Sequence, residues 1–167
     1  MNKPENSNSI EIISRNPGDT RTLGVSIGSQ ATPGYVVLLV GELGTGKTCL
    51  TQGILNGLGS TEYAHSPTFV IMTQYEARLT LYHVDLYRLQ GIEEINELGL
   101  DEYLYNDGIM VIEWAEKGID VYPDNHLLIE LQYMENDQRR IRIRANGENY
   151  RNAICGINLS ERSRDQS

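Results

Sequence analysis

Apolar and β-branched residues form short runs in this chain, and turns rich in glycine, proline and polar residues separate the runs. The run from Tyr35 to Val40 is apolar throughout, which is typical of a strand buried on both faces of a parallel sheet. A second buried strand is predicted from Ile109 to Ile112. Segments 126–133 and 139–145 predict two further strands, which the polar residues between them join as an antiparallel hairpin.

Helix start and stop signals mark two longer segments. Asn16 and Pro17 are typical of the N-cap and first position of a helix, which we expect to continue to about Ala31. A second helix is expected from Lys47 to about Leu58, with Gly59 as its C-terminal cap. Shorter elements are expected elsewhere: an edge strand at 10–13, a hairpin formed by 69–75 and 79–84, and short helices at 91–98 and 101–105.

This order of elements predicts an α/β fold with three layers. We expect a mixed, mainly parallel central sheet with helices on both faces, closed by the antiparallel C-terminal hairpin. A length of 167 residues suits a single domain. The polar segments 1–9 and about 158–167 are expected to be disordered, and the tail from Gly156 onward is expected to be loose.

Composition and charge narrow the class of function. The chain has 14 Lys and Arg against 23 Asp and Glu, a net charge of −9, whereas nucleic-acid binding draws most of its affinity from cationic side chains. A general RNA or DNA binder is therefore disfavoured. The polar N-terminus lacks the apolar core of a signal peptide, the two cysteines do not suit a disulfide scaffold, and no apolar run is long enough to span a bilayer. We expect a cytoplasmic protein with no membrane segment.

The chemistry of the chain centres on one glycine-rich segment. Gly-Glu-Leu-Gly-Thr-Gly-Lys-Thr at 41–48 fits the P-loop (Walker A) pattern G-x-x-x-x-G-K-[ST] at every fixed position, between a predicted strand and a predicted helix. Its backbone N–H groups and the helix N-terminus favour phosphate, Lys47 reaches the β and γ phosphates, and the Thr48 hydroxyl binds Mg²⁺. ATP and Mg²⁺ are therefore the expected ligands. The candidate nucleotide contacts in this segment are Gly41, Glu42, Leu43, Gly44, Thr45, Gly46, Lys47 and Thr48.

A P-loop protein also needs an acidic residue at the end of a second buried strand to hold the magnesium ion. Glu113 follows the strand at 109–112 and Asp85 follows the apolar segment at 81–84. The first strand is the more apolar of the two, so Glu113 is the predicted metal ligand together with Thr48. Asp85 is the candidate for orienting the attacking water or the water shell of the metal. His83, on the same segment, is interpreted as a structural histidine.

Two further candidates lie outside these segments. Thr68, in the first long loop after the P-loop helix, is a candidate contact for the γ-phosphate. Arginines alternate with isoleucines in 139–144, which indicates a half-buried strand with a basic, solvated face. Alternatively, Arg139 contacts the nucleotide, or the basic face meets an acidic partner.

The P-loop, Ser-Pro-Thr-Phe at 66–69, His-Val-Asp-Leu-Tyr-Arg at 83–88, Glu-Leu-Gly at 97–99 and Ile-Glu-Trp at 112–114 occur in this order. Together they closely resemble the TsaE (YjeE) family of bacterial ATPases, over about residues 16–145. The family often has Gly-Arg at the start of the last strand, where this chain has Gln138 and Arg139.

The resemblance implies a slow ATPase that acts with TsaB and TsaD in forming threonylcarbamoyladenosine beside the anticodon of tRNAs that read ANN codons. Contact with tRNA would then be indirect, through these partners. By the same resemblance, Lys47 binds phosphate, Thr48 and Glu113 hold magnesium, and Asp85 is needed for function.

Three other functions are compatible with a P-loop. A small-molecule kinase would need a mobile arginine-rich lid, whereas the arginines here alternate on a predicted strand. A GTPase normally carries an N-K-x-D element after the loop, and none follows it in this sequence. A module that binds ATP with negligible turnover would carry the same residues, and a comparison of binding with turnover distinguishes it from an ATPase.

Overall fold

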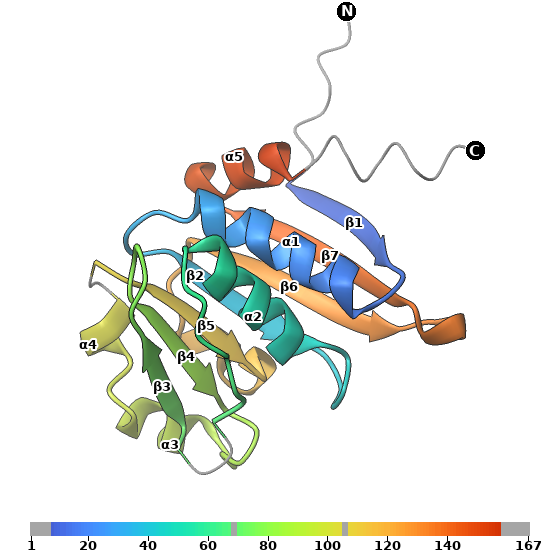
Figure 1. The fold of residues 1–167 in the computed structure, drawn as a ribbon. Helices are drawn as coiled ribbons and strands as arrows, with labels where there is room; N and C mark the ends of the chain where they lie inside the picture. The colour runs from blue at the N-terminus through green and yellow to red at the C-terminus, as the bar shows by residue number, and fades with distance from the viewer. Residues whose placement is uncertain (1–7, 68–69, 105–106, 158–167) are drawn as a thin grey trace, which may run out of the picture.

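The computed structural model describes residues 8–67, 70–104 and 107–157. Its strands form a seven-stranded sheet in the order β1-β7-β6-β2-β5-β4-β3 (Figure 1). The strands are β1 (Ser9–Ser14), β2 (Val36–Val40), β3 (Met72–Tyr75), β4 (Leu81–Asp85), β5 (Ile109–Glu113), β6 (His126–Tyr133) and β7 (Arg139–Asn146). The helices are α1 (Pro17–Gln30), α2 (Lys47–Gly57), α3 (Ile92–Glu97), α4 (Asp101–Leu104) and α5 (Glu148–Gly156), with 3-10 segments η1 (Ala115–Val121) and η2 (Glu135–Asp137).

The centre of the sheet is parallel. β2 pairs in parallel with both β5 and β6, and β4 pairs in parallel with β5. Antiparallel strands complete the two sides: β3 beside β4, and β7 followed by β1 beside β6. The predicted mixed sheet with a mainly parallel centre and an antiparallel C-terminal hairpin is confirmed, and β1 is the edge strand outside that hairpin.

Helices cover both faces of the sheet, as the three-layer prediction requires. α1 and α2 lie next to each other across one face in Figure 1, and the apolar side chains of α1, α2 and α5 pack there against one core cluster. α3, α4 and η1 contribute to a second cluster on the opposite face. The predicted apolar positions Leu23 and Ile27 of α1 and Leu50 and Ile54 of α2 are all buried.

The predicted caps are also present. The side chain of Asn16 accepts a hydrogen bond from the N–H of Asp19 at 2.9 Å. At the end of α2, the N–H of Gly59 binds the carbonyl of Asn56 and the N–H of Ser60 binds that of Leu55, at 2.9 and 3.3 Å. Gly59 has a φ of 90°, so this is a Schellman motif that requires a left-handed residue.

Three sequence predictions need correction. The chain from Gly156 onward was expected to be a loose tail, yet α5 runs to Gly156 and the side chain of Ile157 is 6% exposed in the core. The expected disordered lead-in 1–9 included Ser9, which pairs with Arg144 as the first residue of β1, whereas 1–7 and 158–167 lie outside the described residues. The first strand of the predicted hairpin is shorter than expected, because β3 begins at Met72.

Candidate functional site

The glycine-rich loop connects the carboxyl end of β2 to the N-terminus of α2, so its backbone faces the edge of the sheet where the parallel strands end. Gly46 has a φ of 104° and Gly44 a φ of 79°, conformations that glycine adopts without steric cost. A Cβ on Gly41 would lie 2.5 Å from the backbone carbonyl oxygen of Leu131. The glycine positions of the motif are therefore required by backbone shape and by close contact.

Lys47 is the first residue of α2 and is nearly buried, with 5% of its surface exposed. Its ammonium donates to the carbonyl oxygens of Gly41 and Glu42 at 2.6 and 2.8 Å and lies 4.2 Å from the centre of the Trp114 ring. Burial lowers the pKa of Lys47, and the carboxylates of Glu113, Glu116 and Asp85 oppose that shift. The loop thus holds the Lys47 ammonium, partly removed from water, beside the backbone N–H groups that favour an anion.

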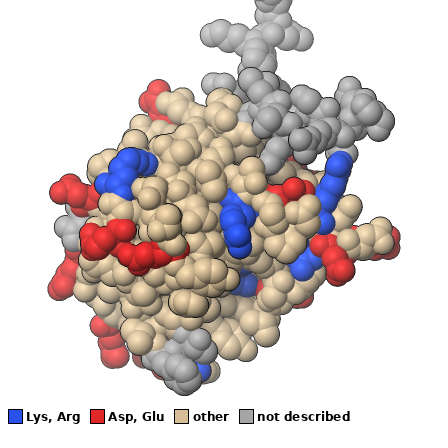
Figure 2. Space-filling view, viewed as in Figure 1, with Lys and Arg blue, Asp and Glu red and all other residues tan. Residues whose placement is uncertain are grey.

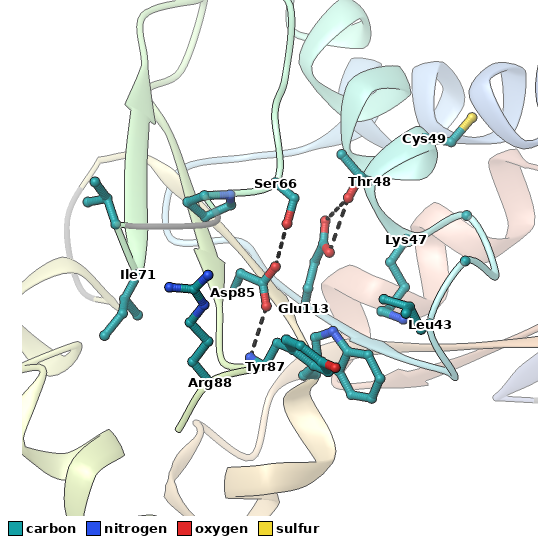
Figure 3. Close-up of a pocket in the computed structure, with 15 residues that line it drawn as sticks. Leu43, Lys47, Thr48, Cys49, Ser66, Ile71, Asp85, Tyr87, Arg88 and Glu113 are labelled. Carbon is teal, nitrogen blue, oxygen red and sulfur yellow. Dashed lines mark hydrogen bonds between the residues drawn. The ribbon is translucent and has the colours of Figure 1, made fainter. Parts of the chain in front are cut away.

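Glu113 and Asp85 end neighbouring strands, and the register of β4 and β5 pairs them directly. Glu113 is almost fully buried, with 2% of its surface exposed, and accepts hydrogen bonds from Thr48 Oγ1 at 3.0 Å and from His83 Nε2 at 2.8 Å. Asp85 is less buried and accepts from Ser66 Oγ at 2.5 Å and from the N–H of Tyr87 at 2.9 Å. Figure 3 shows both carboxylates directed toward the space between Ser66 and Thr48.

These groups line one pocket with a volume of about 420 Å³ (Figure 3). Its polar part consists of the phosphate loop, Asp85, Arg88 and Glu113, and its apolar part includes Leu43, Val70, Ile71 and Trp114. A mostly apolar pocket with a few converging polar groups is typical of a small-molecule site.

Trp114 has an unusual backbone conformation. Its φ of 58° and ψ of 38° place a bulky residue in the left-handed region, directly after Glu113. The indole ring contacts both the Lys47 ammonium and the ring of Tyr87, and the centres of the two aromatic rings are 4.9 Å apart. Backbone strain of this kind is often found at functional sites, where neighbouring contacts maintain it.

The donor set fits a magnesium ion. Mg²⁺ prefers hard oxygen ligands and is usually bound through one or two carboxylates plus phosphate and water. The Thr48 hydroxyl and the Glu113 carboxylate are in contact at the phosphate loop, so they can hold such an ion together. In the part of the chain that the structure describes, no group of three or more His, Cys, Asp or Glu side chains forms a metal cluster.

The structure brings Lys47, Thr48, Asp85 and Glu113 into one pocket, together with Leu43, Gly44 and Gly46 of the loop. Gly41, Glu42 and Thr45 shape the loop without lining the pocket: Glu42 accepts from both Lys47 and Thr45, at 2.8 Å each. Thr68 lies outside the described residues.

Arg139 is not among the residues that line the pocket. Its guanidinium donates to the carbonyl oxygens of Asp137 and Gln138 and lies 4.3 Å from the centre of the Tyr133 ring. The Tyr133 hydroxyl in turn donates to the carbonyl of Leu43 at 2.9 Å. Arg139 therefore reaches the phosphate loop through Tyr133 in this structure.

Sequence reasoning missed several contacts of the site, among them those of Thr51 and Tyr87. Thr51 Oγ1 lies 3.3 Å from Glu113 Oε1, and its position three residues after Thr48 on one helix was a usable signal. The interaction of Tyr87 with Trp114 joins residues that are far apart in sequence, and no sequence pattern indicates it.

Comparison with known proteins agrees with the motifs. A family model described as "Threonylcarbamoyl adenosine biosynthesis protein TsaE" matches residues 14–141. The tRNA threonylcarbamoyladenosine biosynthesis protein TsaE of Treponema pallidum is 39% identical over 134 residues, which cover 80% of this chain and 99% of that protein. The protein of the same name from Bacillus subtilis is 39% identical over 136 residues, covering 81% and 85%.

A solved structure gives the same result at the level of the fold. The crystal structure of YdiB from Bacillus subtilis superimposes with a TM-score of 0.78 and 32% sequence identity, over 89% of this chain and 93% of that one. The family model covers most of the chain, and the similarity extends over nearly the full length of the Treponema relative. The chain therefore belongs to the TsaE family of P-loop proteins.

Proposed function

We propose that this protein binds ATP with Mg²⁺ at its P-loop, hydrolyses it slowly, and acts with TsaB and TsaD in forming threonylcarbamoyladenosine in tRNA, in the cytoplasm. The observation that carries the proposal is the 3.0 Å hydrogen bond between Thr48 of the phosphate loop and the buried carboxylate of Glu113. It joins the two residues that a P-loop protein uses for magnesium. The names of the relatives from Treponema pallidum and Bacillus subtilis support the pathway.

Phosphate binding follows from the loop and Lys47. The first N–H groups of α2 have no acceptor within the helix and are directed toward the loop, where an anion is favoured. An ammonium group has three N–H donors, and two contacts of Lys47 are made to loop carbonyls. With a nucleotide bound, the charge of Lys47 would neutralise the β and γ phosphates, and Thr48 and Glu113 would hold a magnesium ion that stabilises negative charge on them.

Asp85 is the residue that we assign to the attacking water. Its carboxylate faces the same space as Glu113 and is fixed through Ser66 and the backbone of Tyr87. In hydrolysis the water oxygen bonds to the γ-phosphorus, the bond from that phosphorus to the oxygen shared with the β-phosphate breaks, and ADP leaves with that electron pair. Asp85 orients the water, and the proton released goes to solvent or phosphate.

The charge of the molecule supports an indirect role toward tRNA. The net charge is −9, basic and acidic side chains are interspersed on the face shown in Figure 2, and Arg140 and Arg142 of β7 form ion pairs with Glu11. A polyanion such as tRNA is bound through clusters of Lys and Arg. Contact with tRNA is therefore assigned to TsaB and TsaD rather than to this chain.

The nucleotide site is tested with purified wild-type protein and the Lys47→Ala variant, measuring ATP and GTP binding and turnover with and without Mg²⁺. We expect binding of ATP with Mg²⁺, weak turnover without any acceptor molecule, and a loss of turnover of about 100-fold or more in the variant. Turnover unchanged in Lys47→Ala would reject the site. ATP consumption only in the presence of a small-molecule acceptor would indicate a kinase, and binding without any turnover would indicate a binding module.

A further inference from the structure

The two oxygens of the Glu113 carboxylate are held differently. Oε1 lies 2.8 Å from His83 Nε2, 3.0 Å from Thr48 Oγ1 and 3.3 Å from Thr51 Oγ1. Oε2 has a single hydrogen bond among the described residues, with Thr48 Oγ1 at 3.3 Å. Oε1 therefore lies among three polar side chains of the protein, whereas Oε2 is left for a ligand beside Thr48.

His83 is the donor committed to this carboxylate. A threonine hydroxyl has one hydrogen, and Thr51 Oγ1 lies closer to the carbonyl of Lys47, at 3.0 Å, than to Glu113. Thr48 is the candidate metal ligand itself. His83 has neither competing role, and because a carboxylate only accepts hydrogen bonds, its Nε2 carries the hydrogen.

The placement of His83 follows from the sheet. On β4 and β5, Leu81, Ile109 and Val111 face the core cluster under α1 and α2, and strand alternation puts His83 and Glu113 on the same face. The imidazole is fully buried, at 0% exposure. Among the described residues its other nitrogen, Nδ1, has no hydrogen-bond partner.

A buried histidine that only fills space normally has its polar atoms satisfied, and an apolar side chain would fill this position without leaving Nδ1 unpaired. The bond to Glu113 therefore accounts for a histidine here. Glutamate also has one more rotatable bond than aspartate, the commoner metal ligand of P-loop proteins. A fixed donor on Oε1 limits that additional freedom.

We propose that His83 is a positioning residue, which holds Oε1 of Glu113 so that Oε2 is directed to the magnesium ion. The proposal rests on the proposed function for the identity of the ligand, whereas the hydrogen bond itself can be tested without nucleotide or metal. Donors of this kind orient metal ligands and set their affinity for the metal.

The hydrogen bond is tested first, by proton NMR of the protein free of nucleotide and metal. We expect a slowly exchanging, downfield ring N–H signal that is lost in His83→Gln, which removes the ring, and in Glu113→Leu, which removes the acceptor oxygen. The other buried histidine, His126, forms hydrogen bonds with Pro123 and Asn146 at the opposite end of the sheet. Its ring N–H signal is assigned by its loss in His126→Gln. A signal of His83 that keeps its downfield position in Glu113→Leu would overturn the proposal even if ATP binding is normal.

The positioning role is tested by the affinity of a fluorescent ATP analogue in Mg²⁺ and in EDTA. We expect His83→Leu to weaken binding by about 10-fold or more in Mg²⁺ and to leave binding in EDTA unchanged. His83→Gln, which returns an N–H donor at similar reach, should recover most of the loss, and His126→Gln should resemble wild type. In a Glu113→Gln background, His83→Leu should have no further effect on the Mg²⁺ dependence.

Equal losses in Mg²⁺ and in EDTA would show that His83 serves only the fold and would overturn the proposal, as would an unchanged Mg²⁺ dependence in His83→Leu. If His83→Leu does not fold, as judged by its melting curve, His83→Met, which also lacks an N–H donor, takes its place in the same comparison of Mg²⁺ with EDTA. Wild-type protein that binds no nucleotide under either condition would instead remove the proposed function, and the NMR result would still decide whether His83 orients Glu113.

Discussion

The charged side chains of the site differ in burial, and the difference matches the proposed roles of Lys47, Glu113 and Asp85 in binding phosphate, metal and water. Lys47 and Glu113 are 5% and 2% exposed, so their charges are weakly screened by water. Asp85 is only partly buried and opens onto the pocket, where a water molecule can reach it. The buried charges suit binding of phosphate and metal, and the more open carboxylate suits contact with a water.

Asp85→Asn should separate binding from turnover. The amide keeps the size of the side chain and an oxygen that accepts from Tyr87, whereas it loses the charge that orients water. We expect nucleotide affinity close to wild type and single-turnover hydrolysis reduced by about 100-fold. Asp124→Asn, at an exposed turn before β6 and so at the opposite edge of the sheet, is the matched control. Equal loss of affinity and turnover in Asp85→Asn would indicate a structural role instead.

The two cysteines should differ in reactivity. Burial raises the pKa of Cys49, whose Sγ lies 3.3 Å from the carbonyl of Pro17, so less of it is thiolate at a given pH. Cys155 is exposed. We expect iodoacetamide to label Cys155 before Cys49 near neutral pH, and the Cys49 rate to rise more at alkaline pH, with both followed by peptide mass spectrometry. Faster labelling of Cys49 at neutral pH would contradict this assignment.

At the scale of elements, α2 is held against α1 by glycines. A Cβ on Gly28 would lie 2.1 Å from the carbonyl oxygen of Ile54, and one on Gly53 would lie 2.2 Å from that of Arg21. Contacts this short exclude any side chain larger than hydrogen unless the helices separate. Because α2 carries Lys47 and Thr48 at its start, the distance between these helices also fixes the phosphate loop.

Gly28→Ala should therefore destabilise the protein. The added methyl group forces the helices apart, and we expect the free energy of unfolding to fall by about 1–3 kcal/mol, measured by urea denaturation. Gly91→Ala is the control, because no atom lies within 4 Å of a Cβ there and the residue has an extended φ of −169°. Similar stability of the two variants would show that the helix contact is looser than described.

Much of this fold could be predicted from short patterns in the sequence. The apolar run before the loop, the cap at Asn16 and the glycine motif are short-range signals, and they predicted β2, α1, α2 and the phosphate site. The sequence analysis did not predict α5, because polar residues surround its few apolar ones. The buried residues of this segment nevertheless recur at helical spacing: Tyr150, Ala153, Ile154 and Ile157.

The contacts that refine the site were less accessible from sequence. His83 was interpreted as structural, and only the pairing of β4 with β5 shows that its ring reaches Glu113. The cation–π contact between Lys47 and Trp114 likewise depends on an unusual backbone conformation after β5. Such features arise from tertiary contacts between distant segments, which local periodicity does not encode.

At the scale of the whole molecule, the fold places its nucleotide site at one edge of the sheet, with exposed apolar residues at its rim. Leu43, Val70 and Tyr87 line the pocket and are 70%, 63% and 51% exposed. No helix in the described ranges is long and apolar enough to cross a membrane. An acidic protein with an open nucleotide pocket is consistent with ATP turnover that depends on protein partners.

The most direct test is ATP turnover by the purified protein, first alone and then with TsaB and TsaD added, using Lys47→Ala throughout as the inactive reference. We expect slow turnover by the protein alone and a clear rise with the two partners, and we expect neither in Lys47→Ala. Turnover that does not respond to the partners would contradict the assigned pathway while leaving the P-loop as a nucleotide site.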